Sequence, residues 1–177
     1  MDDIITKFPY KTCIIEIQRD PEPLNPRTEW DDPLVTLVHW HRRLNLCDDR
    51  IEHMTEEELR ASVPDIVALL PLYLLDHSGQ TMNTTGFACR WDSGQVGWGY
   101  VTKEDQENAE CADWSEEKLK EAIVAAVETY DKYLRGEVYG YVVKDSTGEE
   151  IEACWGYFDI EEAKDAAKGV VPDVSPV

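Results

Sequence analysis

The chain has 177 residues, of which 37 are acidic and 17 are basic, and its formal net charge is −20. A field this negative repels nucleic acids and anionic membranes, which argues against direct binding to either, and it attracts basic protein surfaces. The length favours one folded domain, and six Trp and eight Tyr argue against disorder. No apolar segment approaches the roughly 18 residues of a membrane span.

The cysteines and the N-terminal residues indicate the compartment. The cysteines are widely spaced, with no CxxC pair: Cys13, Cys47, Cys89, Cys111 and Cys154. This pattern does not predict a structural zinc site, and it fits reduced, mostly buried thiols in a bacterial cytosol. The first ten residues, MDDIITKFPY, lack the basic region and the apolar run of a signal peptide. We therefore expect the protein in the cytoplasm of a bacterial host cell, with no metal and no cofactor.

The N-terminal part of the chain combines one predicted strand with irregular or ambiguous segments. Thr12–Gln18 is rich in β-branched residues and is predicted to be a strand. Asp20–Trp30 contains three prolines and is predicted to be an irregular connection. Leu34–His41 is ambiguous, because Asp32 followed by Pro33 is a good helix start whereas its β-branched residues favour a strand. We favour a helix there.

A short helix and an apolar segment follow. Thr55–Ala61 is predicted to be a helix, because Thr55 and Glu58 have the spacing of a capping box. Val67–Asp76 is almost continuously apolar, which predicts a buried strand or extended segment. Pro71 argues against a regular central strand, because proline has no N–H to donate to a neighbour.

The second half of the chain contains two predicted β-hairpins and a final helix. Thr85–Arg90 and Gln95–Thr102 are predicted to pair through an Asp-Ser-Gly turn. Val138–Lys144 and Glu150–Phe158 are predicted to pair around Ser-Thr-Gly. Ile160–Lys168 is predicted to be a short helix.

A long helix is predicted over Trp114–Arg135, with Ser115 as its N-cap and Gly136 as its stop. Its apolar residues recur at three- and four-residue steps: Leu119, Ile123, Val127, Tyr130 and Leu134. The elements together predict an α+β fold with a mainly antiparallel sheet, one long amphipathic helix and several short helices. We expect one domain over residues 1–171 and a flexible tail over residues 172–177.

One group of side chains has the chemistry of an enzyme site. His39, His41, Asp76, His77 and Asp92 are residue types that hold catalytic metals. His39 and His41 share a face only if their segment is a strand, and no complete HExxH-type pattern is present. The alternative interpretation is a packed His39 and a local His-Arg-Arg basic patch that begins at His41.

Two further motifs are incomplete. Ser78 and Ser93 have His and Asp nearby, but neither serine lies in the GxSxG elbow of a serine hydrolase, and simple turns explain both. Gly94–Gly99 is glycine-rich but lacks the strand–GxGxxG–helix context and the Walker lysine of a nucleotide site. Its glycines are expected to let Trp91 and Trp98 pack over the backbone.

Carboxylates gather in two parts of the chain, residues 104–121 and 145–165. On a helix, carboxylates one turn apart are separated by about 5–6 Å, comparable to charges along a nucleic-acid backbone. Such a face can act as a DNA mimic in a Lys/Arg groove built for phosphates, although a merely solvated face is equally consistent. The predicted partner-binding residues are Glu116, Glu117, Glu121, Glu128 and Asp131 on the long helix, with Trp98 and Trp114 as aromatic anchors and Trp30 and Tyr139 as further anchor candidates.

Three stretches of the chain resemble a family of small proteins encoded by bacteriophages, plasmids and integrated mobile elements. They are Asn25–Cys47, Leu70–Lys103 and Tyr130–Val142, and the sharpest part is WDSGQVGW at residues 91–98. The resemblance implies no catalytic residues. It singles out motif residues whose role stays open: Asp76, His77, Trp91, Asp92 and Gln95.

The resemblance implies a protein that counters host defence, for some members as an anti-CRISPR inhibitor of Cas9. Cas9 holds its nucleic acids in positively charged channels, to which an acidic protein would be steered without any catalysis. We therefore predict stoichiometric binding to a basic nucleic-acid-binding protein, with Cas9 as the expected partner, and a block of DNA binding or cleavage. Two alternatives stay open: a small hydrolase or modifying enzyme that uses Asp76, His77 and Asp92, and an interaction protein unrelated to defence.

Overall fold

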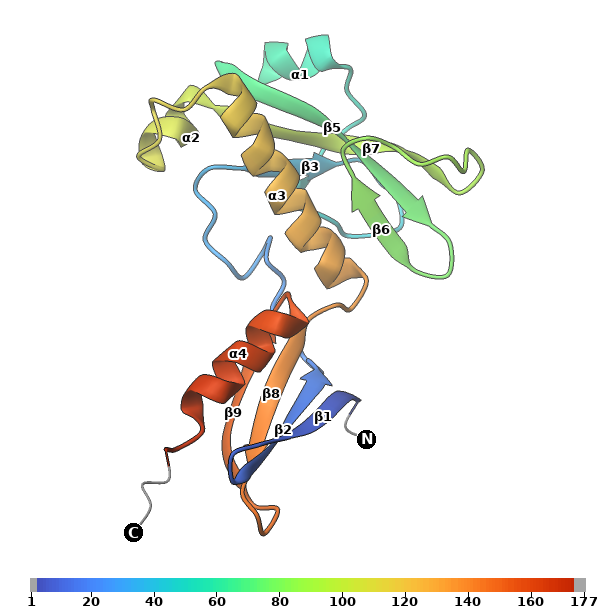
Figure 1. Ribbon diagram of the computed structural model, residues 1–177. Helices are drawn as coiled ribbons and strands as arrows, with labels where there is room; N and C mark the ends of the chain where they lie inside the picture. Colours follow the sequence, from blue (N-terminus) through green and yellow to red (C-terminus); the bar gives the residue numbers. More distant parts are fainter. Residues whose placement is uncertain (1–2, 174–177) are drawn as a thin grey trace. The chain divides into compact units, whose positions relative to one another are not determined.

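The computed structural model describes residues 3–173, which form two compact units (Figure 1). Unit 1 consists of residues 3–24 and 136–173, and unit 2 of residues 25–135. The sequence predicted one domain over residues 1–171, whereas the described residues have two separate hydrophobic cores. The chain leaves unit 1 after its second strand and returns for its third, so that unit 2 is an insertion. The predicted tail lies outside the described residues from residue 174 onward.

The predicted α+β class is confirmed, with two mostly antiparallel sheets. Unit 1 has a sheet of order β1-β2-β8-β9 in which every pairing is antiparallel. Its elements are β1 (Ile4–Tyr10), β2 (Cys13–Arg19), β8 (Tyr139–Lys144), β9 (Glu150–Tyr157) and α4 (Ile160–Val170). The predicted β8–β9 hairpin and final helix are thereby confirmed. Among residues 3–173, no helix combines the length and the apolar composition that a membrane span requires.

Helix α4 covers one face of the unit 1 sheet. Alternate residues of β2 and β8 point to that face and bury Ile15, Ile17 and Val143 completely against the small Ala163 and Ala167 of the helix. The alternation follows from the two-residue period of a strand. The opposite set of β2 residues therefore lies on the other face of the sheet.

A buried carboxylate occupies the centre of that other face. Glu16 is 1% exposed and forms ion pairs of 2.8 Å with both Lys7 on β1 and Lys144 on β8. Gln18 Nε2 also donates to its carboxylate at 3.1 Å. Burial raises the pKa of Glu16, but the hydrogen bonds from Lys144 and Lys7 outweigh that effect and hold the pKa below its usual 4.5. The ion pairs therefore link β1 and β8 to β2 through the Glu16 carboxylate.

Unit 2 has a five-stranded sheet of order β4-β3-β7-β5-β6, in which only the β3–β4 pairing is parallel among the described strands. The strands are β3 (Thr36–His39), β4 (Asp49–Arg50), β5 (Ile66–Asp76), β6 (Gln80–Asn83) and β7 (Ser93–Thr102). The helices are α1 (Glu56–Ser62), α2 (Lys103–Asn108) and α3 (Glu116–Leu134). The predicted capping box of Thr55 and Glu58 is present at the start of α1.

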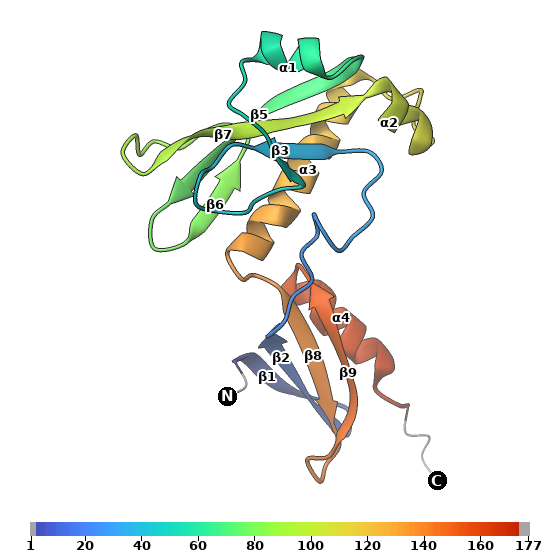
Figure 2. The ribbon, with the colours of Figure 1, turned by 180° about the vertical axis from the view of Figure 1, so that it is seen from behind.

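Helix α3 crosses one face of the unit 2 sheet, which both views show (Figures 1 and 2). Ser115 caps its first turn, and the helix ends just before Gly136, as predicted. The predicted stripe of apolar residues faces the core, where Ile123 and Tyr130 are almost fully buried. The Tyr130 hydroxyl accepts a hydrogen bond of 2.9 Å from the backbone N–H of Cys47, which ties the loop before β4 to the helix.

The helix predicted over Leu34–His41 is wrong, because this segment contains strand β3. The local start signal is real: Asp32 Oδ1 accepts hydrogen bonds from the N–H groups of Leu34 and Val35. No helix follows because the β-branched segment pairs with β7 and β4, and non-local pairing overrides the cap.

The hairpin predicted between Thr85–Arg90 and Gln95–Thr102 is also wrong. β7 instead pairs with β5 and β3, and residues 84–92 form an irregular loop without a strand. The partner of β5 on its other side is β6, which the sequence did not reveal. Pro71 is tolerated because β6 pairs with β5 only from Tyr73 onward, so no β6 acceptor faces the proline.

The glycine-rich part of β7 allows two close approaches. A Cβ atom on Gly97 would overlap the carbonyl oxygen of Val38 on β3, and one on Gly99 would lie 2.7 Å from Ile123 of α3. The prediction that these glycines let Trp91 pack over the backbone is wrong, because Trp91 is 96% exposed.

We predict that Gly97→Ala destabilises unit 2 by about 2 kcal/mol or more, because the added methyl meets fixed backbone rather than a movable side chain. Gly94→Ala on the same strand is the matched control, since a Cβ there meets nothing within 4 Å. Urea unfolding of both variants measures the difference. Equal unfolding midpoints would contradict the packing of β7 against β3.

We predict that Glu16→Gln lowers the stability of unit 1 by about 1–2 kcal/mol at pH 7, because two lysines lose their shared partner. The folded pKa of Glu16 is depressed, so its contribution is present above pH 4.5 and is lost as the pH falls through the folded value. The two proteins should therefore converge in stability as the pH falls below 4.5 and through the depressed folded pKa. Hydrogen exchange of β2 amides at several pH values measures this, and a pH-independent gap would refute it.

Candidate functional site

The predicted motif residues gather at one end of the β5–β7 pair. His77 Nδ1 lies 3.3 Å from Asp92 Oδ2, and the Asp76 N–H donates to the Asp92 carbonyl oxygen at 2.9 Å. All three residues are exposed, and Trp91 stands beside them in solvent. Gln95 lies apart from this group, where its amide donates to the carbonyl of Gly97 at 3.2 Å. The arrangement is an open surface pair of imidazole and carboxylate.

The other candidate metal ligands do not join this group. His39 is fully buried, and its ring nitrogens lie against the backbone N–H groups of His41 and Leu46. Burial lowers the pKa of His39, which keeps the imidazole neutral. Within residues 3–173, no three His, Cys, Asp or Glu side chains form a group that could hold a metal ion. The alternative of a packed structural His39 therefore describes this residue.

The five cysteines are free, as expected, and three of them are buried: Cys13, Cys47 and Cys111. Burial raises the pKa of Cys47 to about 12, so this thiol is not a nucleophile at neutral pH. Cys89 is exposed in the loop before β7, with its Sγ 3.8 Å from a carboxylate oxygen of Asp92.

The predicted partner-binding carboxylates of α3 divide into two sets. Asp131 is directed inward and accepts hydrogen bonds from Thr81 Oγ1 at 2.6 Å and Met82 N–H at 2.8 Å, which fixes β6 to the helix. Glu116 is engaged by Lys120 at 2.6 Å, and this hydrogen bond lowers the pKa of Glu116. The remaining residues form what we call the acidic stripe: Glu117, Glu121 and Glu128. They are exposed and make no ion pair with any described residue.

Two of the predicted aromatic anchors, Trp98 and Trp114, make contacts inside unit 2. Trp98 donates its Nε1–H to the carbonyl of Met54 at 2.9 Å, which holds the segment before α1. Lys118 lies over the Trp114 ring, 3.9 Å from its centroid. The most exposed tryptophans of the described chain are Trp91, at 96%, and Trp30, at 45%, of which Trp30 was also an anchor candidate.

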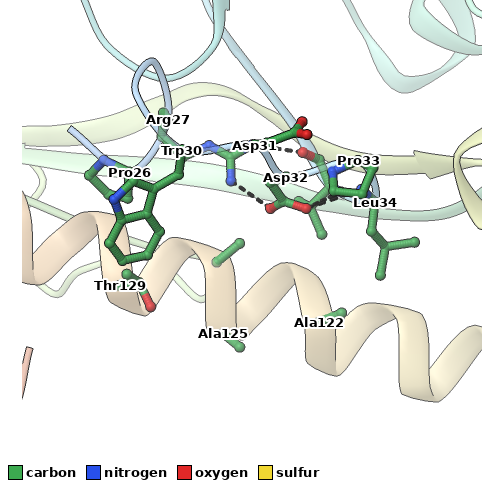
Figure 3. Close-up of a pocket in the computed structure, with 12 residues that line it drawn as sticks. Pro26, Arg27, Trp30, Asp31, Asp32, Pro33, Leu34, Ala122, Ala125 and Thr129 are labelled. Atoms are coloured by element: carbon green, nitrogen blue, oxygen red, sulfur yellow. Dashed lines mark hydrogen bonds and ion pairs between the residues drawn. The ribbon is translucent and has the colours of Figure 1, made fainter. Parts of the chain in front are cut away.

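Trp30 marks a groove that sequence reasoning missed. A cavity of about 380 Å³ lies between the loop of residues 26–35 and α3. In Figure 3, the Trp30 indole extends from the loop toward the Thr129 end of the helix, and Leu34 toward the Ala122 end. The helix side of the groove is lined by Ala122, Ala125, Ala126 and Thr129. The sequence pattern that could have indicated the groove is the series of small residues at three- and four-residue steps on α3, which face Trp30 in the structure.

Arg27 holds the loop that forms the outer wall of this groove. Its guanidinium, 5% exposed, binds both carboxylate oxygens of Asp48 at 2.6 Å and one of Asp32 at 2.8 Å. It also donates to the Val35 carbonyl at 2.7 Å. Burial lowers the pKa of Arg27, but the hydrogen bonds that it donates to the two aspartates outweigh that effect and raise the pKa above its usual value. The wall is thus positioned by a charged guanidinium that donates four hydrogen bonds.

The acidic stripe borders the same groove. Glu121 and Glu128 lie four residues before and three residues after Ala125, so helical geometry puts them beside it on the surface. Asp31 is exposed on the opposite wall. The groove therefore combines a small apolar floor, an aromatic wall and carboxylates on both sides.

Comparisons of this chain with protein-family models, with curated proteins and with solved structures found no match. The resemblance described from the sequence therefore stays a prediction.

We predict that Arg27→Met destabilises unit 2 by about 3 kcal/mol, because it leaves the Asp48 carboxylate without its partner in a largely buried position. Arg42→Met is the matched control, because Arg42 is exposed and has no interaction with a described residue. Thermal unfolding of both variants gives the comparison. A loss no larger than that of the control would show that the loop does not depend on Arg27.

Proposed function

We propose that this protein is a stoichiometric inhibitor that binds the basic nucleic-acid-binding surface of a bacterial defence protein in the cytoplasm of the host cell. The expected partner is Cas9, with or without guide RNA, and the expected effect is a block of DNA binding or cleavage. The binding needs no catalytic residue and no cofactor. It operates through charge complementarity and a few apolar contacts.

The observation that carries this proposal is the acidic stripe of α3. Its three carboxylates face solvent and form no ion pair with any described residue, on a chain of net charge −20. Glu117 and Glu121 are one helical turn apart, and Glu128 follows about 10 Å further along the axis at 1.5 Å per residue. A rigid helix held on a sheet presents these charges at fixed spacing. That is the property needed to replace phosphates in a positively charged channel.

We expect that titration of the protein into Cas9 with guide RNA and target DNA abolishes cleavage near a one-to-one ratio. Salt should weaken the inhibition, because exposed charges are screened beyond a Debye length of about 8 Å at physiological ionic strength. The triple variant Glu117→Lys, Glu121→Lys, Glu128→Lys should lose most of its potency. The matched control, which makes the same charge change in unit 1, is Glu149→Lys, Glu150→Lys, Glu152→Lys.

Gel shifts with catalytically inactive Cas9 separate a block of DNA binding from a block of a later step. Full cleavage at large excess, without co-migration, would refute Cas9 as the partner. The same assay also tests the alternative of an enzyme that uses Asp76, His77 and Asp92, because His77 and Asp92 are in contact. Inhibition far below one-to-one that disappears in His77→Ala and Asp92→Ala would favour an enzyme, whereas unchanged potency of these variants would exclude it.

A further inference from the structure

We propose that the groove between residues 26–35 and α3 is the docking site for one basic amphipathic helix of the partner protein, an inference that rests on the proposed function. The acidic stripe alone would attract any basic surface. The groove adds a shaped contact that can select one of them, because it offers a place for apolar side chains beside the charges.

The shape of the groove fits a helix. Its floor residues Ala122, Ala125, Ala126 and Thr129 follow the three- and four-residue rows along which helices pack against one another. Small side chains at these positions let a second helix come close to α3. The volume of about 380 Å³ is near the lower end of the roughly 300–1,000 Å³ of ligand pockets, so it accepts a few side chains rather than a broad surface. Trp30 is the type of residue that dominates binding hot spots.

The charges around the groove specify a basic occupant. Asp31 on the loop and Glu121 and Glu128 on the helix are exposed and have no ion pair with the described residues. Arg27 also lines the groove, but its guanidinium is satisfied by Asp48, Asp32 and the Val35 carbonyl. The groove thus has three carboxylates beside an apolar floor, while Lys118 and Lys132 follow along the helix at its two ends, where Lys118 lies over the Trp114 ring. A helix with leucine-like residues on one face and Arg or Lys beside them is complementary, and a nucleic acid is not.

The test uses a synthetic helical peptide with leucines along one face and arginines on both flanks, and a second peptide with glutamates in place of the arginines. Alanine-methyl NMR of the full chain should show shifts at Ala122, Ala125 and Ala126 with the basic peptide only. Glu121→Lys with Glu128→Lys should weaken binding about tenfold, as expected for two exposed ion pairs. Glu149→Lys with Glu152→Lys, the same charge change in unit 1, should weaken it by about threefold or less.

A second variant tests shape without any change of charge. Ala125→Tyr fills the groove at an exposed position, so it should weaken peptide binding while the urea midpoint stays unchanged. Three results would each overturn the inference. They are equal weakening by the double lysine variants of α3 and of unit 1, methyl shifts outside the groove, and no binding of the basic peptide at low salt. The assay contains no Cas9. A failure of peptide binding therefore counts against the groove as a docking site and not against Cas9 inhibition. A failure of Cas9 inhibition counts against the proposed function and leaves the peptide result unchanged.

Discussion

The Arg27 guanidinium connects two segments of unit 2, the loop of residues 26–35 and the residues just before β4. It binds Asp48 before β4, Asp32 in the loop before β3, and the carbonyl of Val35. Asp48 in turn accepts a hydrogen bond from the N–H of Leu37, the first fully buried residue of β3. This bidentate pair fixes where the loop of residues 26–35 runs beside α3. We infer that this pair holds the loop at a distance from the helix, so that the loop forms the outer wall of the groove.

Local signals predicted the parts of the fold that depend on local interactions. Three predicted features are found in the structure: the capping box at Thr55, the apolar stripe of α3 and the β8–β9 hairpin. Each of them is formed by residues close together in the sequence. β3 was mistaken for a helix because its cap signal is local whereas its strand partners are 11 to 64 residues away. Arg27 could not be singled out for the same reason, since Asp48 lies 21 residues along the chain.

The most specific stretch of the sequence, residues 91–98, contains residues with opposite environments. Gly97 is required where β3 approaches β7, and Trp98 supports the segment before α1, so both are architectural. Trp91 and Asp92 lie exposed at the start of the same strand, beside His77. The sequence alone does not distinguish the buried residues from the exposed ones, because each tryptophan is followed or preceded by glycine or a small polar residue. Burial decides between them, and burial depends on contacts with β3 and residues 51–55, which the pattern does not contain.

Charge by itself cannot account for a tight and selective complex. Each exposed ion pair contributes about 0.2–1 kcal/mol, so the three carboxylates of the acidic stripe supply roughly 1–3 kcal/mol. A nanomolar complex requires about 12 kcal/mol. The difference must come from apolar surface, at about 25 cal/mol per Å² removed from water, less the cost of ordering both partners. In the proposed complex, the acidic stripe would therefore set the association rate and the need for a basic partner, while the choice among basic partners would depend on exposed apolar groups such as Trp30 and the alanine floor beside it.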